Sequence, residues 1–267
     1  MLISGIFAAI VAILATISIE KFGGKLGGLL SSIPSTVVPA SIGFWFAAQD
    51  QNAFLQSIYT VPLGMLVNGL FLYSWRILPS KISNAKSLIQ QLLLMIIGSL
   101  GVWAIGAFSL MQILHRIDNL PAWSLGGFCT LLIFGILACR GNPPAPKGGN
   151  RISVITLLSR GILAGLAIGF AVFLASLGSS LLAGMTSVFP AIFLTTMVSI
   201  WLSQGQAVQL GAVGPMILGS ASVAFYALLC AWSFPIFGVL WGALLSWFGA
   251  VILISIPSWQ YLKRQRN

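Results

Sequence analysis

Long apolar stretches separated by short polar ones are the dominant pattern along the chain. A helix needs about 20 apolar residues to cross a bilayer, and nine stretches lie near that length. They cover residues 1–20, 26–48, 54–75, 88–114, 122–139, 157–176, 180–202, 211–232 and 235–256. Only a short segment, Ser233 to Pro235, separates the last two. The pattern predicts an all-α polytopic integral membrane protein with about nine transmembrane helices.

Composition agrees with this class. Of the 267 residues, 58% are hydrophobic and 6% are charged, whereas a soluble domain carries about 25% charged residues. Too few polar side chains remain to cover the surface of a soluble fold. We interpret the first stretch as a retained helix and not a signal peptide, because its first basic residue, Lys21, follows the apolar run.

The distribution of basic residues predicts an orientation. With nine spans, the loops after odd-numbered helices and the C-terminal tail share one face and hold all of the 13 Lys and Arg residues except Arg116. Cytoplasmic loops carry such an excess. We therefore expect the N-terminus outside the cell membrane and the C-terminus in the cytoplasm. The net charge of +10 is explained in this way, and no nucleic-acid partner is expected.

The two halves of the chain resemble each other. Four pairs match at a constant spacing of 156 residues: Gly28/Gly184, Ser31/Ser187, Pro34/Pro190 and Trp45/Trp201. We divide the chain into a first repeat (1–120), a linker helix with a Pro/Gly-rich cytoplasmic loop (121–156) and a second repeat (157–267). Because one linker helix separates two four-helix copies, the copies have inverted topology, an arrangement found in secondary transporters and in some channels.

Prolines inside the second and seventh stretches mark the candidate substrate site. Pro34 and Pro190 each remove a backbone N–H from a helix, and the freed carbonyls need other partners within a bilayer. Hydroxyl groups surround both positions. The candidate substrate-binding residues are Ser31, Ser32, Pro34, Ser35, Thr36, Thr186, Ser187, Pro190, Thr195 and Thr196, together with Asn68. The alternative is that these residues only kink and pack helices.

Ionisable groups near the spans are few. Glu20 and Arg160 are candidates for coupling or charge recognition, against the alternatives of an interfacial ion pair with Lys21 and of snorkelling to the interface. Asn68 has the alternative of a hydrogen bond between helices. The three cysteines lack metal-ligand spacing and His115 is the only histidine, so no metal, cofactor or catalytic residue is expected, and an enzyme is not predicted.

The second half resembles the GlpM-type family of small bacterial inner-membrane proteins. The motif consists of Ala183-Gly-Met-Thr-Ser-Val-Phe-Pro190, Gly214-Pro-Met-Ile-Leu-Gly-Ser220 with Tyr226, and Pro235-Ile-Phe-Gly238. The first half matches only around Gly28 and Pro34. Since members of this family are single copies of about four helices, the resemblance implies a duplicated and fused version in a bacterial cytoplasmic membrane.

These features favour a small-solute transporter, a secondary carrier or an exporter. The basic face and the helix N-termini point to a polar or anionic substrate. A non-transporting subunit of a larger complex is the main alternative, and a channel is the third. Beyond the lipid bilayer, the partners expected are the solute and, as an open alternative, further copies of the chain.

Overall fold

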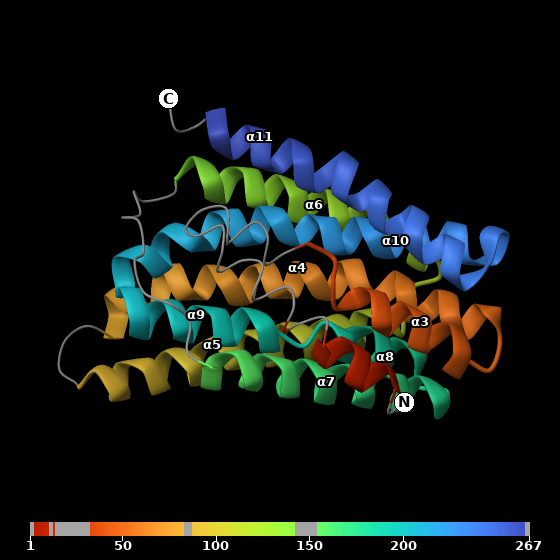
Figure 1. The fold of residues 1–267 in the computed structure, drawn as a ribbon, viewed down its shortest axis with the longest axis horizontal. Coiled ribbons are helices and arrows are strands. Elements are labelled where there is room, and N and C mark those ends of the chain that lie inside the picture. The colour runs from red at the N-terminus through yellow and green to blue at the C-terminus, as the bar shows by residue number, and fades with distance from the viewer. Residues whose placement is uncertain (1–2, 11–12, 14–32, 83–86, 142–153, 265–267) are drawn as a thin grey trace.

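The described part of the chain is helical throughout. The computed structural model describes residues 3–10, 13, 33–82, 87–141 and 154–264. After a helical segment at 3–10, the helices, labelled as in Figure 1, are α3 (Val37–Ala47), α4 (Gln51–Ile82), α5 (Leu88–Leu114), α6 (Leu120–Arg140), α7 (Val154–Ser176), α8 (Ser180–Ser187), α9 (Ala191–Gln204), α10 (Gln206–Ala250), a π-helical turn (Val251–Ser255) and α11 (Ile256–Arg264).

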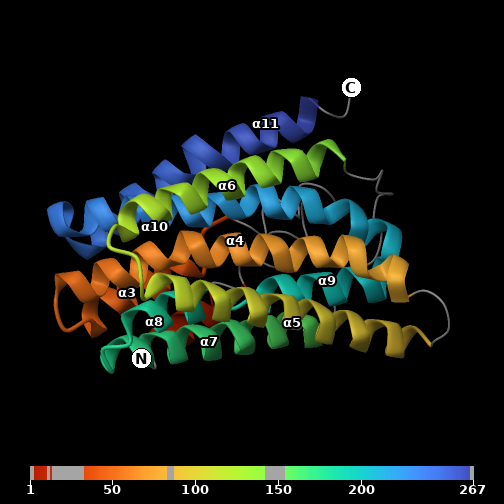
Figure 2. The ribbon, with the colours of Figure 1, turned by 180° about the vertical axis from the view of Figure 1, so that it is seen from behind.

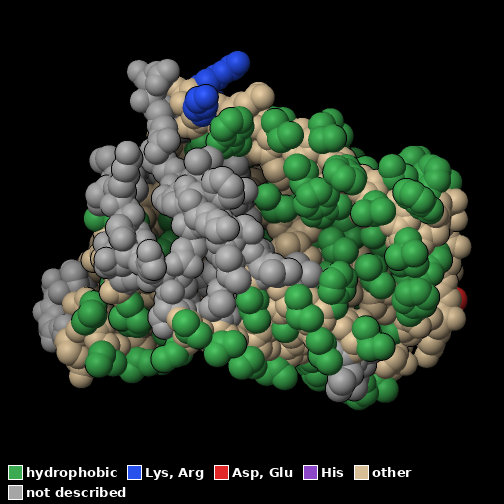
Figure 3. All heavy atoms as spheres, viewed as in Figure 1, with side chains coloured by type: hydrophobic (Ala, Val, Ile, Leu, Met, Phe, Trp, Pro, Cys, Tyr) green, Lys and Arg blue, Asp and Glu red, His purple; other side chains and the backbone are tan. Residues whose placement is uncertain are grey.

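Five helical stretches of the described chain are long and apolar enough to span a membrane. They are Gln51–Ile82, Leu88–Leu114, Leu120–Arg140, Ser180–Leu202 and Gln206–Arg264. Their outer surfaces carry large apolar side chains, such as Phe108 at 67% and Leu240 at 71% exposure, and Figure 3 shows such side chains over much of the visible face. A water-facing surface of this kind would be costly, so the chain is suited to lipid.

α4 lies at the centre of the bundle. In its most apolar window 72% of the residues are buried, against 22% in α5. Figures 1 and 2 show α10 on one side of α4 and α8 and α9 on the other, with α6 and α11 beyond α10 and α5 and α7 along the opposite edge. A side chain that points from α4 into the bundle therefore meets residues from both halves of the sequence.

Local capping sets several helix ends. The hydroxyl of Ser87 accepts from the N–H of Gln90 at 3.4 Å, and the Gln90 side chain accepts from the N–H of Ser87 at 3.3 Å, so α5 begins with a capping box. Asn119 caps α6 by accepting from Ala122 at 3.2 Å. The sequence predicted α5 at its observed bounds.

The predicted break between Ser233 and Pro235 is wrong. The chain stays helical through Pro235 and reverses at Gly238, where φ is 75° and ψ is 169°. This conformation is open almost only to glycine. We call residues 206–237 the first arm of α10 and 239–250 its second arm. The Ser233 hydroxyl lies 2.8 Å from that of Ser246, which shows that the two arms pack side by side in opposite directions.

Other predicted spans differ in their bounds. The stretch 180–202 is a pair of helices, α8 and α9, with Val188 to Pro190 between them. In the stretch 26–48, α3 begins only at Val37 and follows bends at 33–36, while 26–32 lies outside the described residues. α4 (Gln51–Ile82) extends beyond the predicted 54–75 at both ends, and it contains Pro62 and Pro79 without ending at either.

The charged ends of the helices are segregated. The C-terminal ends of α4, α6 and α11 all lie toward one end of the bundle, on the left in Figure 1. Their last turns contain Lys81, Arg140, Lys263 and Arg264. The turns before α4 and α6, at the opposite end, contain Asp50, Arg116 and Asp118.

Candidate functional site at the helix break

The break between α8 and α9 interrupts a buried helix. Val188 is 6% exposed and Pro190 is buried. Proline has no N–H to donate to the carbonyl of Thr186, and the N–H of Phe189 bonds that carbonyl instead, at 3.0 Å. The carbonyl of Val188 is left without a helical donor, because the chain departs from the helix before the next turn forms.

Asn68 supplies the missing bond. Its amide nitrogen Nδ2 donates to the carbonyl oxygen of Val188 at 2.7 Å. Asn68 lies near the middle of α4 and is 1% exposed. The structure therefore brings one sequence-predicted residue, Asn68, to another predicted feature, the break before Pro190, through a hydrogen bond between helices.

The hydroxyl groups near the break bond to their own helices. Ser187 donates to the carbonyl of Gly184 at 2.7 Å, Thr195 to that of Ala191 at 2.9 Å, and Thr196 to that of Ile192 at 2.6 Å. Such bonds to the preceding turn are common for Ser and Thr in helices. They occupy the hydroxyl protons and leave oxygen lone pairs, so these side chains are able to accept further hydrogen bonds. Thr186 is half-buried.

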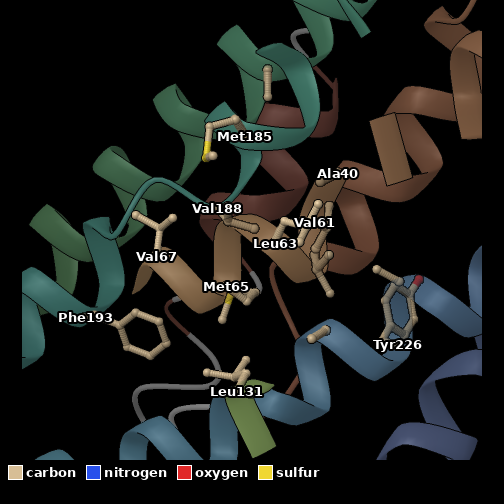
Figure 4. Close-up of a cluster of buried hydrophobic side chains, with 14 of the residues drawn as sticks. Ala40, Val61, Leu63, Met65, Val67, Leu131, Met185, Val188, Phe193 and Tyr226 are labelled. Atoms are coloured by element: carbon tan, nitrogen blue, oxygen red, sulfur yellow. The ribbon is translucent and has the colours of Figure 1, made fainter. Parts of the chain in front are cut away.

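Close packing holds α8 against α4. A Cβ atom on Gly184 would clash with the carbonyl oxygen of Ser57 and with the side chain of Thr60. Figure 4 shows Met185 and Val188 pointing toward α4, in the same buried cluster as Met65. Two helices approach this closely only where a residue as small as glycine lies in the contact. Gly184 therefore sets the distance between α8 and α4.

The candidates in the first half lie in a separate place. Pro34 is buried, and Ser35 and Thr36 are half-buried, in the bends that lead into α3. In the described part of the chain, no hydrogen bond joins this segment to the break at Pro190. Ser31, Ser32 and Glu20 lie outside the described residues, and Arg160 lies in α7 with its side chain outside them.

A second buried amide, Gln209, was missed by the sequence analysis. It is 0% exposed, and its Nε2 donates to the carbonyl oxygen of Trp75 at 3.3 Å and lies 3.5 Å from the sulfur of Met197. The Trp75 carbonyl needs this donor because Pro79, four residues later, has no N–H. That spacing was the available signal, but Gln209 stood outside the predicted span 211–232.

Two pairs of hydrogen-bonded hydroxyl groups join α3 to α10 and the two arms of α10 to each other. Ser41 lies 2.8 Å from the Tyr226 hydroxyl and donates to the carbonyl of Val38 at 2.9 Å. Near the α10 turn, Ser233 of the first arm and Ser246 of the second arm share a hydrogen bond. These polar groups are all buried and paired, so they fix helix positions without exposing polar atoms to lipid.

Aromatic side chains pack at two levels of the bundle. Trp45 of α3 lies 5.0 Å from Phe54 and 5.8 Å from Phe234, between ring centroids. Trp201 of α9 lies 6.1 Å from Trp75. The two tryptophans that match across the sequence repeat therefore each contact a long helix of the other half.

A comparison of the chain with family models, with curated proteins and with solved structures finds no match. The resemblance to the GlpM-type family therefore rests on the motif in the sequence. Among the described residues, no group of three His, Cys, Asp or Glu side chains is placed to hold a metal ion. What the site offers chemically is hydrogen bonding within an apolar bundle.

Proposed function

We propose that the chain is a small-solute membrane transporter with its site at the helix breaks around Pro190 and Pro34. The observation that carries this proposal is the buried interruption between α8 and α9, closed by Asn68 from another helix. Secondary transporters place substrates at interrupted helices near the middle of the membrane, where half-helix ends and free carbonyls meet.

The packing of residues 3–10 and Ile13 against α7 supports an inverted repeat. A Cβ on Gly5 would lie 2.9 Å from the carbonyl oxygen of Gly165, and one on Gly165 would lie 2.8 Å from that of Gly5. Gly161 in turn faces Ala9 and Ile13. At the repeat spacing of 156 residues, Gly5 corresponds to Gly161 and Ala9 corresponds to Gly165. The contacts thus map onto one another, as a twofold axis between two antiparallel helices requires.

The two longest helical stretches support the same relationship. Shifted by 156 residues, α4 covers 207–238, which matches the first arm of α10 and the turn at Gly238. Figure 1 shows α4 and this first arm running in opposite directions. We propose nine spans in all, with α8 and α9 forming one and the arms of α10 belonging to two.

We also propose that the end of the bundle with Lys81 and Arg140 faces the cytoplasm. Basic residues gather there, and cytoplasmic ends carry more Lys and Arg than the opposite ends. The C-terminal end of α11 lies at the same end. Fusion of a reporter that is active only in the cytoplasm after Arg264 tests this orientation.

A non-transporting subunit is the second candidate. The observation that favours it is the close packing of α8 on α4 at Gly184. This contact holds together two helices that border the proposed site. The exposed apolar side chains of α5, including Ile105 at 71% exposure, suit a partner helix as well as lipid. Purification in mild detergent with a stoichiometric partner would favour this candidate.

Cysteine accessibility tests the transport proposal. Single cysteines at 34–36 and 186–191, in a background that lacks Cys129, Cys139 and Cys230, are treated with impermeant thiol reagents from each side of the membrane. Reaction at both segments that changes side with a solute or with conditions supports alternating access. Protection from both sides under all conditions contradicts it and favours the subunit.

A further inference from the structure

Asn68 and Gln209 are two buried amides with one arrangement in common. Each donates from its side-chain nitrogen to a backbone carbonyl that lacks its helical donor, at 2.7 Å to Val188 and at 3.3 Å to Trp75. The first carbonyl is freed by the helix break and the second by Pro79. The two side chains are 1% and 0% exposed.

The orientation of each amide follows from its partner. A backbone carbonyl only accepts hydrogen bonds, so the NH₂ group has to face it. The oxygen atoms Asn68 Oδ1 and Gln209 Oε1 then face elsewhere, and neither has a hydrogen-bond partner among the described residues. Because a buried acceptor without a partner is destabilising, two of them point to a ligand that supplies donors.

The residues that carry these two oxygens both lie at one face of α4, Asn68 within that helix and Gln209 in contact with it. Asn68 and Trp75 are seven residues apart, so they lie on the same face of α4, about 10 Å apart along the helix. Val188 lies just before α9, and Trp201 near the end of α9 packs on Trp75. Gln209, near the start of α10, bonds the Trp75 carbonyl, so Asn68, Trp75 and Gln209 lie where α4 meets Val188, Trp201 and the start of α10.

A third group at this interface is a donor. The indole N–H of Trp75 is buried and has no partner among the described residues. A ligand in contact with this group and with Gln209 Oε1 has to accept one hydrogen bond and donate another. A hydroxyl group does both. A carboxylate or phosphate group would instead bring its negative charge against the two amide oxygens.

The charge balance favours a neutral ligand over a cation. Of the three acidic residues in the chain, Asp50 and Asp118 lie in turns at the far end of the bundle, and Glu20 lies outside the described residues. In the described spans, then, no carboxylate is present to balance a cation. An unbalanced charge within a bilayer is strongly unfavourable.

We infer that Asn68, Trp75 and Gln209 bind a small neutral solute rich in hydroxyl groups. The inference rests on the proposed transport function and names its substrate class, in place of the anionic solute that the basic loops suggested. The solute would move along α4 between the break at Val188 and the end that carries Lys81.

Ligand-observed NMR tests this binding separately from transport. The full chain in lipid nanodiscs is mixed with glycerol, erythritol or erythronate, the acid anion in which one CH₂OH of erythritol is replaced by a carboxylate. Saturation transfer from the protein should reach the two polyols and should be absent, or at least about tenfold weaker, for erythronate. This comparison uses the wild-type chain and does not depend on the folding of a variant.

Two variants and two matched controls assign the contacts. Gln209→Met and Asn68→Leu remove the amides with little change in volume, and loss of one hydrogen bond should weaken erythritol binding about tenfold. Gln56→Met and Asn52→Leu make the same exchanges at exposed positions and should bind as wild type.

Any of three results would overturn the inference. The first is no saturation transfer to either polyol, which leaves bound water as the partner of these groups. The others are equal transfer to erythronate and unchanged erythritol binding in both amide variants. Uptake of labelled erythritol into proteoliposomes is measured on the same preparations. Binding without uptake keeps the assigned site and contradicts the transport proposal. Uptake of an anion without polyol binding keeps transport and removes the assigned substrate class.

Discussion

The amide nitrogen of Asn68 lies 2.7 Å from the carbonyl oxygen of Val188, a residue 120 positions later in the chain. This bond ties the central helix α4 to the point where α8 gives way to α9. Among the described residues, it is the one hydrogen bond that joins a predicted site residue of the first half of the chain to the broken helix of the second half.

Loss of that bond should destabilise the protein. In Asn68→Leu the Val188 carbonyl keeps its burial and loses its donor, which we expect to cost about 1–3 kcal/mol. Thermal unfolding of the purified chain in detergent measures the change, with the exposed Asn52→Leu as the control. Equal stability of the Asn68 variant and the control would show that the carbonyl finds another donor.

Adding one methyl group should change the stability of the protein differently at Gly184 and at Gly126. Gly184→Ala places a Cβ against the backbone of Ser57, and overpacking of this kind costs about 1–3 kcal/mol. Gly126, in the middle of α6, has nothing within 4 Å of its added Cβ. Gly126→Ala should therefore leave stability unchanged or raise it by about 0.5–1 kcal/mol.

Unfolding curves of both alanine variants check this prediction. If Gly184→Ala is as stable as Gly126→Ala, then α8 is free to move away from α4, and the distance between them is not set by Gly184.

The reversal of α10 should allow a disulfide between its arms. The hydroxyl oxygens of Ser233 and Ser246 are 2.8 Å apart, so Ser233→Cys with Ser246→Cys, in a background without native cysteines, should form a disulfide under mild oxidation. Mass spectrometry after proteolysis detects it. Ser233→Cys with Ser258→Cys is the control pair, and Ser258 lies in α11, beyond the second arm. A bond in the control but not in the test pair would place the turn elsewhere.

Ser41 and Tyr226 should be coupled in energy. Their hydroxyls lie 2.8 Å apart between α3 and α10, and hydrogen bonds between membrane helices average about 0.6 kcal/mol. A double-mutant cycle with Ser41→Ala and Tyr226→Phe measures the coupling. Additive effects of the two changes would mean that the bond contributes nothing to stability.

The sequence predicted elements well where local chemistry sets their ends. α5 has its observed bounds because Ser87 and Gln90 form a cap at the first turn and the polar residues after Leu114 end the apolar run. The helical membrane class followed from the long apolar stretches and the scarcity of charged residues. Both inferences need only neighbours along the chain.

Other features depend on contacts that no local pattern contains. Pro235 indicated a break, yet the reversal occurs at Gly238, where the backbone conformation is one that proline cannot adopt. Gln209 fell between two predicted spans, and its contact could not be predicted because its partner, the carbonyl of Trp75, is 134 residues away. The role of Asn68 needed the position of Val188, which only the folded bundle supplies.

The turn at Gly238 also bears on how the chain enters a membrane. In the proposed topology the two arms cross the membrane as a helical hairpin, and its tip at Phe237 to Val239 carries no charge. The first arm begins toward the same end of the bundle at which α11 ends with Lys263 and Arg264. Such a hairpin would insert without moving a charged side chain across the hydrocarbon core, a transfer that is strongly unfavourable.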